Sequence, residues 1–245
     1  MNIVIDIGNS KTKIALFDKG KLSLLKIFDK NNFNALKLFV TRCSGNEKVI
    51  LSSVIRENKK LNGFLKNKFN CFIELKPSTP FPIKNKYFTP LTLGNDRMAN
   101  VVASANLFPN RNVLVIDTGT CLKFDFIDKK KKYHGGAISP GMMMRYKSLK
   151  AFTAKLPLVN PSKKVLRIGN STKTSIISGV QNGMAAEMDG MISGLRKKYN
   201  SLAVILTGGD ASFFVNRLKN PIFAIPNLTL HGLNEILNFN VPQNC

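Results

Sequence analysis

Two short segments of the chain combine a carboxylate, a glycine and hydroxyl side chains in the same order. Residues 6–10 read Asp-Ile-Gly-Asn-Ser, and residues 117–121 read Asp-Thr-Gly-Thr-Cys. A glycine in a turn lets the backbone approach a ligand, and exposed N–H groups there can donate hydrogen bonds to phosphate oxygens. A carboxylate at the end of a strand is a hard oxygen ligand that suits Mg²⁺. One such turn indicates only a hairpin, whereas two copies favour phosphate binding.

Both segments belong to a longer pattern that occurs twice. Residues 3–18 and residues 113–128 each contain an apolar run, then Asp-x-Gly, then a second run that tends to alternate between apolar and polar residues. This order predicts a strand, a tight turn and a strand in both places. The copies are separated by nearly half of the 245 residues. We therefore expect a duplicated domain, with an N-terminal half over residues 1–110 and a C-terminal half over residues 111–245.

The elements that must position these turns alternate between strands and helices. Amphipathic spacing and alanine content predict helices over residues 32–42, 95–106, 172–199 and 230–239. Short apolar runs predict further strands over residues 48–54, 70–75 and 202–209. This alternation is typical of the α/β class.

The composition is that of a soluble globular protein. Hydrophobic residues make up 44% of the chain and charged residues 21%, which excludes disordered and fibrous classes. No apolar run approaches the roughly 20 residues that a membrane-spanning helix needs. Asp6 interrupts the apolar start of the chain where a signal peptide would have an unbroken apolar core. We therefore expect a cytoplasmic protein without a membrane partner.

Several common sites are not predicted. The four cysteines include no Cys-x-x-Cys pair and there are only two histidines, so the sequence does not favour a zinc site. The phosphate-binding pattern G-x-x-x-x-G-K-[ST] and the dinucleotide pattern G-x-G-x-x-G are also missing.

The charge is strongly positive, with 37 basic and 14 acidic residues and a net charge of +23. Such a charge attracts nucleic acid or acidic molecules. The lysines are spread along the chain, however, and asparagine is also abundant, which is typical of AT-rich codon usage. We interpret the charge mainly as compositional drift, and nucleic acid is not the expected partner.

Later segments carry a family resemblance. The two hairpins together with LTGGDA at residues 206–211 resemble the superfamily of actin, sugar kinases and heat-shock chaperones. Three more segments follow in the expected order: YFTPLTLGNDRMAN at residues 87–100, HGGAISPGMMMRYKSLKAFTAKLP at 134–157 and IGNSTKTSIISGV at 168–180. With the N-terminal DIGNS they are similar to the type III pantothenate kinases, from residue 1 to about residue 235.

The resemblance implies a fold, a reaction and a set of partners. The fold would be two ribonuclease-H-like halves, as in actin-like ATPases, with a nucleotide cleft between them. The reaction would be ATP-dependent phosphorylation of pantothenate to 4'-phosphopantothenate, the first step of coenzyme A biosynthesis. Such kinases resemble one another in being homodimers that need Mg²⁺ and a monovalent cation, K⁺ or NH₄⁺.

The resemblance also implies roles for individual residues. Asp96 would be the general base, a role that suits a carboxylate within reach of a primary hydroxyl. Asp117 would bind the monovalent cation, and Asp6 would lie nearest Mg²⁺, directly or through water. The ATP contacts would be Asp6, Ile7, Gly8, Asn9, Ser10, Lys11, Thr12, Lys13 and Thr120, and the substrate contacts Tyr87, Gly94, Asn95, Asp96, Arg97 and Thr172.

Two points stay open at this stage. Lys123 stands where the family pattern has a small hydroxyl residue, which leaves the cation dependence undetermined. Without the resemblance, Asp96 and Arg97 would be read as an ordinary helix N-terminus. The alternatives are a kinase of the same fold that acts on another small hydroxyl compound, and a basic transcription-accessory or nucleic-acid-binding protein.

Overall fold

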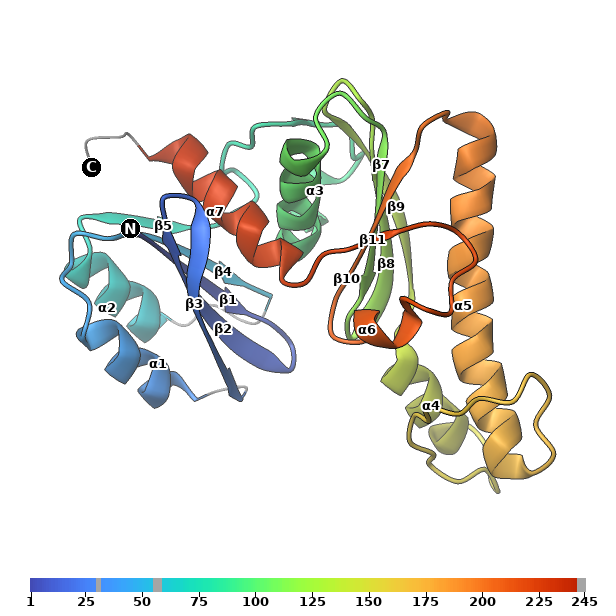
Figure 1. Cartoon of the computed structure of the whole chain (residues 1–245). Helices are drawn as coiled ribbons and strands as arrows, with labels where there is room; N and C mark the ends of the chain where they lie inside the picture. Colours follow the sequence, from blue (N-terminus) through green and yellow to red (C-terminus); the bar gives the residue numbers. More distant parts are fainter. Residues whose placement is uncertain (30–31, 55–58, 242–245) are drawn as a thin grey trace. The chain divides into compact units, whose positions relative to one another are not determined.

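A computed structural model describes residues 1–29, 32–54 and 59–241, which form two compact units (Figure 1). Unit 1 comprises Met1–Leu107 and Leu228–Cys245, and unit 2 comprises Phe108–Asn227. In the part of the chain that is described, no helix is long and apolar enough to cross a bilayer.

Unit 1 is built on a sheet with the strand order β3-β2-β1-β4-β5. The strands β1 (Asn2–Ile7), β2 (Lys11–Asp18) and β3 (Lys21–Asp29) are antiparallel neighbours. The strands β4 (Lys48–Ser53) and β5 (Cys71–Glu74) continue the sheet parallel to β1. The carboxyl ends of β1, β4 and β5 therefore lie at one edge of the sheet, where ligands bind in α/β folds.

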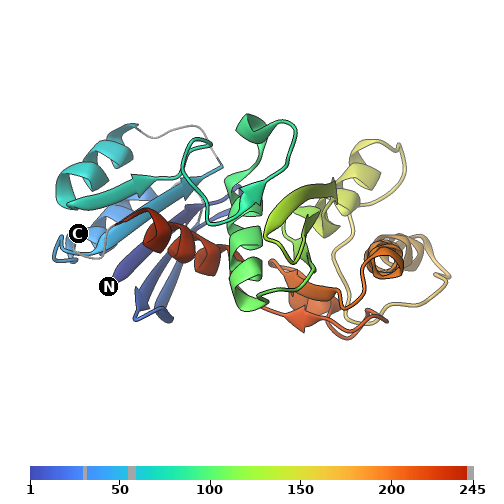
Figure 2. The same cartoon turned by 90° about the horizontal axis from the view of Figure 1, so that it is seen from above.

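Helices cover both faces of this sheet (Figures 1 and 2). The helices α1 (Phe33–Thr41) and α2 (Lys59–Lys68) pack on the face that carries Ile3 and Ile5. The helices α3 (Asn95–Leu107) and α7 (Leu228–Asn240) pack on the opposite face, which carries Val4. Side chains alternate between the faces of a strand, so β1 is apolar on both sides. The short β6 (Lys84–Asn85) and a 3₁₀ turn, η1 (Pro90–Thr92), lead into α3.

Unit 2 repeats the hairpin and adds a long helix. Its strand order is β11-β10-β7-β8-β9, with β7 (Val113–Thr118), β8 (Cys121–Ile127) and β9 (Lys132–Pro140) antiparallel. The strands β10 (Ala203–Thr207) and β11 (Phe223–Ala224) run parallel to β7. The helices α4 (Met142–Ala151), α5 (Thr172–Lys198) and the short α6 (Ala211–Phe214) complete the unit. Apolar residues of α4 and α5 pack on Leu114 and Ile116 of β7.

The C-terminal helix does not join the half that its position in the chain suggests. The expected halves, 1–110 and 111–245, differ from the observed units because α7 packs on α3 and β1 of unit 1. The two helices approach closely at a glycine, since a Cβ at Gly232 would lie 1.8 Å from the carbonyl oxygen of Ala99. A sequence repeat shows where the second hairpin begins, but not which sheet the last helix covers.

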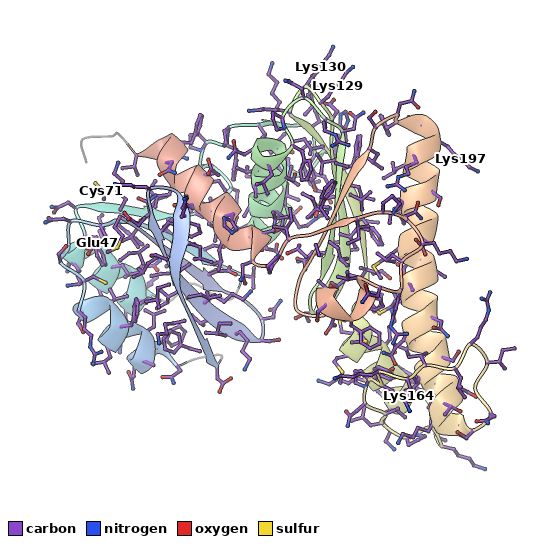
Figure 3. The ribbon with its side chains drawn as sticks, viewed as in Figure 1. Glu47, Cys71, Lys129, Lys130, Lys164 and Lys197 are labelled. Atoms are coloured by element: carbon purple, nitrogen blue, oxygen red, sulfur yellow. The ribbon has the colours of Figure 1, made fainter. Side chains whose placement is uncertain are left out.

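Lysine side chains project from separate places on unit 2 (Figure 3). Lys129 and Lys130 lie at the tip between β8 and β9, Lys164 lies in the segment before α5, and Lys197 lies in the last turn of α5. These labelled lysines do not form a single basic face.

Candidate active site

The first expected phosphate-binding turn joins β1 to β2 in unit 1. Ile7 lies opposite Thr12, and within the turn the N–H of Gly8 donates to the carbonyl oxygen of Lys11 over 2.9 Å. Asp6 is half-buried at the carboxyl end of β1, and Asn9 and Ser10 are exposed at the turn. The turn therefore presents a carboxylate and exposed polar groups at the edge where parallel strands end.

The other expected ATP contacts of this hairpin differ in accessibility. The side chains of Ile7 and Thr12 are buried, so these residues can reach a nucleotide only through their backbone. Lys11 is exposed and forms an ion pair of 2.5 Å with Asp29 of β3. Lys13 is half-buried and lies directly opposite Asp6 in the antiparallel register.

The start of α3 holds the expected general base. The side-chain amide of Asn95 donates to the carbonyl oxygen of Leu75 over 3.1 Å, which ties the helix start to the residue after β5. Oδ1 of Asp96 accepts a hydrogen bond of 2.9 Å from the backbone N–H of Arg97. An acidic side chain in the first turn is favoured by the partial positive charge of the helix N-terminus.

Gly94 makes room for the Asp96 carboxylate. A Cβ atom at position 94 would lie 2.6 Å from Oδ1 of Asp96, closer than real Cβ atoms come to other heavy atoms. The observed orientation of the carboxylate therefore requires glycine at this position.

Tyr87 and Arg97 also meet in unit 1. Arg97 is 4% exposed, and its guanidinium carbon lies 5.5 Å from the centre of the Tyr87 ring. A guanidinium over an aromatic face is attracted by the ring quadrupole, which holds both side chains in place. The structure thus gathers Tyr87, Gly94, Asn95, Asp96 and Arg97, the expected substrate contacts of this unit, around the start of α3.

The second hairpin holds Asp117 at the carboxyl end of β7 in unit 2. Asp117 is 8% exposed, and Lys123 lies directly opposite it on β8. Nζ of Lys123 is 2.9 Å from Oδ2 of Asp117. The other oxygen, Oδ1, lies against two glycines, because a Cβ would be 3.1 Å from it at Gly119 and 2.5 Å from it at Gly208.

Two hydrogen bonds tie the end of β7 to the Gly-Gly step after β10. The hydroxyl of Thr118 donates to the carbonyl oxygen of Thr207 over 2.9 Å. The N–H of Asp210 donates to the backbone carbonyl oxygen of Thr118 over 3.0 Å. Burial raises the pKa of the Asp210 carboxyl above its usual value. Asp210 is not among the residues expected from the sequence, although an acid directly after Gly208-Gly209 is a signal that could have identified it.

The helix α4 begins against the turn that contains Thr120. A Cβ at Gly141, the N-cap of α4, would lie 2.3 Å from the carbonyl oxygen of Thr120. Arg145 donates from Nε to the carbonyl oxygen of Pro140 over 2.8 Å and pairs with Glu187 of α5. Arg145 was not among the expected site residues either, and its helix was not predicted.

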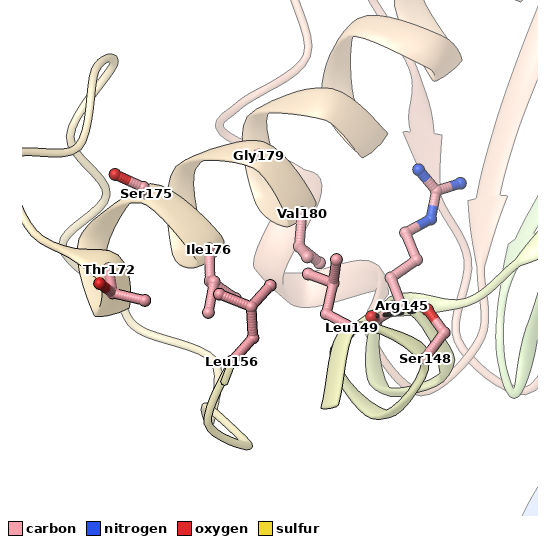
Figure 4. A pocket seen from close by; sticks show the side chains of 9 residues that line it. All are labelled: Arg145, Ser148, Leu149, Leu156, Thr172, Ser175, Ile176, Gly179 and Val180. Atoms are coloured by element: carbon pink, nitrogen blue, oxygen red, sulfur yellow. Dashed lines mark hydrogen bonds between the residues drawn. The ribbon is translucent and has the colours of Figure 1, made fainter. Parts of the chain in front are cut away.

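A cavity of about 560 Å³ lies between α4 and the start of α5 (Figure 4). Thr172, an expected substrate contact, is the first residue of α5 and lines this cavity. The hydroxyl of Ser171 caps the helix by accepting from the N–H of Thr174, which fixes the position of Thr172. The lining is mainly apolar, and its residues are Arg145, Ser148, Leu149, Leu156, Thr172, Ser175, Ile176, Gly179 and Val180.

The two expected metal ions fit these residues differently. Within residues 1–29, 32–54 and 59–241, no three His, Cys, Asp or Glu side chains cluster into a metal cage. Mg²⁺ in kinases is held by one or two carboxylates together with phosphates and water, so Asp6 beside an exposed turn fits it. A monovalent cation at Asp117 fits poorly, because an ammonium group already contacts that carboxylate.

Comparison with known proteins gives one consistent family. A family model described as type III pantothenate kinase matches residues 2–194. A type III pantothenate kinase from Phocaeicola vulgatus is 47% identical over 240 residues, which cover 98% of this chain and 99% of the relative.

Solved structures show the fold. A Baf family transcriptional activator from Campylobacter jejuni aligns with a TM-score of 0.59 and 23% identity, over 97% of this chain and 98% of that one. An inorganic polyphosphate/ATP-glucomannokinase from an Arthrobacter species aligns with a TM-score of 0.51 and 15% identity, over 98% and 99%. The expected α/β fold of two ribonuclease-H-like halves is confirmed.

Proposed function

The chain belongs to the type III pantothenate kinase family, and we propose that it phosphorylates pantothenate with ATP to form 4'-phosphopantothenate. This reaction is the first step of coenzyme A biosynthesis. The observation that carries the proposal is the 47% identity to a pantothenate kinase over 98% of this chain, with Gly94, Asp96 and Arg97 gathered at the start of α3.

We propose that the two hairpins hold ATP. In unit 1 the turn after Asp6 offers exposed polar groups for the phosphates, and in unit 2 the turn at Gly119 and Thr120 meets the start of α4. Asp6 would hold Mg²⁺, directly or through water. When bound, Mg²⁺ neutralises charge on the phosphate oxygens as the γ-phosphoryl group is transferred.

Asp96 is the proposed general base. Its carboxylate would accept the proton of the primary hydroxyl as the γ-phosphoryl group arrives, while the hydrogen bond from Arg97 N–H orients it. The Arg97 guanidinium would pair with the pantothenate carboxylate or with a phosphate. Tyr87, Asn95 and Thr172 would complete the substrate contacts.

We also propose that the protein is a homodimer that works in the cytoplasm. Support for the dimer comes from α5, which has glycines with open space around them at positions spaced along one face. Glycine costs about 1 kcal/mol relative to alanine in an exposed helix interior, so close approach of a second backbone explains such a stripe. The glycines are Gly179, Gly183, Gly190 and Gly194.

The enzymatic test is a coupled assay of ADP release with MgATP and a panel of acceptors. We expect turnover with pantothenate and none with hexoses or short hydroxy acids. Asp96→Asn keeps the size of the side chain and removes the base, so kcat should fall by about 10²–10⁴-fold. The matched control is Asp18→Asn, an exposed aspartate at the end of β2, which should keep wild-type turnover.

Other results would contradict the assignment. Turnover with a different hydroxyl compound, but not with pantothenate, would move the protein to another kinase specificity on the same fold. No turnover, with DNA binding that weakens steeply as salt rises, would favour the nucleic-acid alternative.

A further inference from the structure

Lys123 occupies the place at Asp117 that a monovalent cation is expected to take. The two residues are directly opposed across the antiparallel strands β7 and β8, and Nζ lies 2.9 Å from Oδ2. Their side chains are only 13% and 11% exposed. The contact is therefore a largely buried ion pair that the hairpin register imposes.

The ammonium group of Lys123 and a monovalent cation such as K⁺ or NH₄⁺ are chemically similar. A lysine side chain ends in an ammonium group, which carries the same single charge as K⁺ and is the protein-bound counterpart of NH₄⁺. A carboxylate in a partly buried site is stabilised by one nearby positive charge, and a second cation at the same oxygen would repel the first. A potassium ion at Oδ2 would therefore have to displace Nζ of Lys123.

The second carboxylate oxygen of Asp117 faces two glycines of unit 2. Oδ1 lies close to the backbone of unit 2, since an added Cβ would be 2.5 Å from it at Gly208 and 3.1 Å from it at Gly119. The same Cβ at Gly208 would be 2.6 Å from the carbonyl carbon of Thr118. Gly119 and Gly208 therefore line the Oδ1 side of the carboxylate, whereas Lys123 holds the Oδ2 side.

We propose that the ammonium group of Lys123 replaces the monovalent cation, so that this chain works without K⁺ or NH₄⁺. The enzymatic consequence rests on the proposed kinase function, whereas the binding consequence does not. Because the charge is attached to β8, it is present at every salt composition. The small hydroxyl residue of the family pattern would leave room for a free ion there, and Lys123 does not.

The test compares the wild-type protein with Lys123→Thr, which restores the small hydroxyl side chain. Turnover is measured with MgATP and pantothenate in chloride salts of potassium, ammonium, sodium and N-methylglucamine at equal ionic strength. Wild-type turnover should change by less than about twofold among these salts, because its cation is built in. Lys123→Thr should lose about tenfold or more without K⁺ or NH₄⁺ and recover when either is added.

The matched control is Lys130→Thr in the exposed turn between β8 and β9, which removes the same charge away from Asp117. This variant should behave as the wild-type protein does in every salt. This control separates the general effect of removing one positive charge from the specific effect of removing the lysine that contacts Asp117.

A second readout does not depend on turnover. A ligand that binds only the folded state raises its melting temperature. The melting temperature of the wild-type protein should be the same in potassium and N-methylglucamine salts, whereas K⁺ should raise that of Lys123→Thr. The melting temperatures test the inference even if pantothenate is not the substrate. The comparison of salts with the wild-type protein alone tests it even if Lys123→Thr does not fold.

Three results would overturn the inference. The first is wild-type turnover that rises several-fold with K⁺ or NH₄⁺ but not with sodium. The second is a wild-type melting temperature that rises specifically with K⁺. The third is a folded Lys123→Thr protein that keeps full turnover in N-methylglucamine salt, because the charge at Asp117 would then be dispensable.

Discussion

Gly94→Ala should impair catalysis by displacing a carboxylate without unfolding the protein. The new Cβ would lie 2.6 Å from Oδ1 of Asp96, so the carboxylate must rotate away. Rotation breaks the 2.9 Å hydrogen bond from Arg97 N–H, a loss of about 1 kcal/mol. Gly94 is not among the residues with positive φ, so its backbone conformation accepts alanine. Alanine also lowers the conformational entropy of the unfolded chain, which stabilises the folded protein by up to about 1 kcal/mol.

The effect on turnover is expected to be much larger than the effect on stability. A displacement of about 1 Å in a catalytic group can cost about 10²-fold, which corresponds to about 2.7 kcal/mol in the barrier. The melting temperature should change by only a few degrees, as expected for about 1 kcal/mol in a chain of this length. The measurements are the coupled assay of ADP release and differential scanning calorimetry.

Gly63→Ala is the matched control. Gly63 lies inside α2, and a Cβ there meets no atom within 4 Å. The same substitution should therefore stabilise unit 1 by up to about 1 kcal/mol and leave kcat unchanged. Gly94→Ala should add nothing in the Asp96→Asn background, because both changes act through one carboxylate. Full turnover of Gly94→Ala, or additive losses in the double variant, would refute the role given to Asp96.

Three further predictions concern the second hairpin, the dimer and pH. Gly208→Ala should lower the unfolding free energy by roughly 2 kcal/mol in denaturant titration, because φ is +98° and the Cβ would meet Asp117; an unchanged midpoint would contradict this. If the protein forms the proposed homodimer, Gly190→Leu should convert it to a folded monomer in light scattering, and an intact dimer would remove the α5 stripe from the interface. Burial lowers the pKa of His231, which packs edge-on against Phe17, so the unfolded state binds the proton more readily and stability should fall as pH drops below about 6.5. His231→Phe should flatten that fall in urea titrations at several pH values, and an identical slope would contradict the assignment.

Much of the fold could be predicted because its signals are local. Both hairpins lie where the duplicated Asp-x-Gly pattern placed them, and α3 and α5 begin at or next to the expected residues. Each has a clear apolar run or helical spacing. The helix α4 was not predicted, because only Met142 and Tyr146 of its ten residues are buried and its apolar periodicity is correspondingly weak.

Contacts that depend on register or on distant packing could not be predicted. The length of the turn between β7 and β8 sets the register that places Lys123 opposite Asp117. A shift of the register by one residue would move the Lys123 side chain to the other face of the sheet. The sequence identified Lys123 as a departure from the family pattern but not as the partner of Asp117. The position of α7 in unit 1 depends similarly on its packing against α3, far away in the sequence.

The most direct test of the proposed kinase activity is the identity of the product. Purified protein is incubated with MgATP and pantothenate, and the mixture is analysed by mass spectrometry and phosphorus NMR. We expect one phosphate monoester on the primary hydroxyl of pantothenate for each ADP released, and its loss in Asp96→Asn. The proposed activity would be contradicted if the pantothenate stayed unchanged while the same preparation phosphorylated another hydroxyl compound.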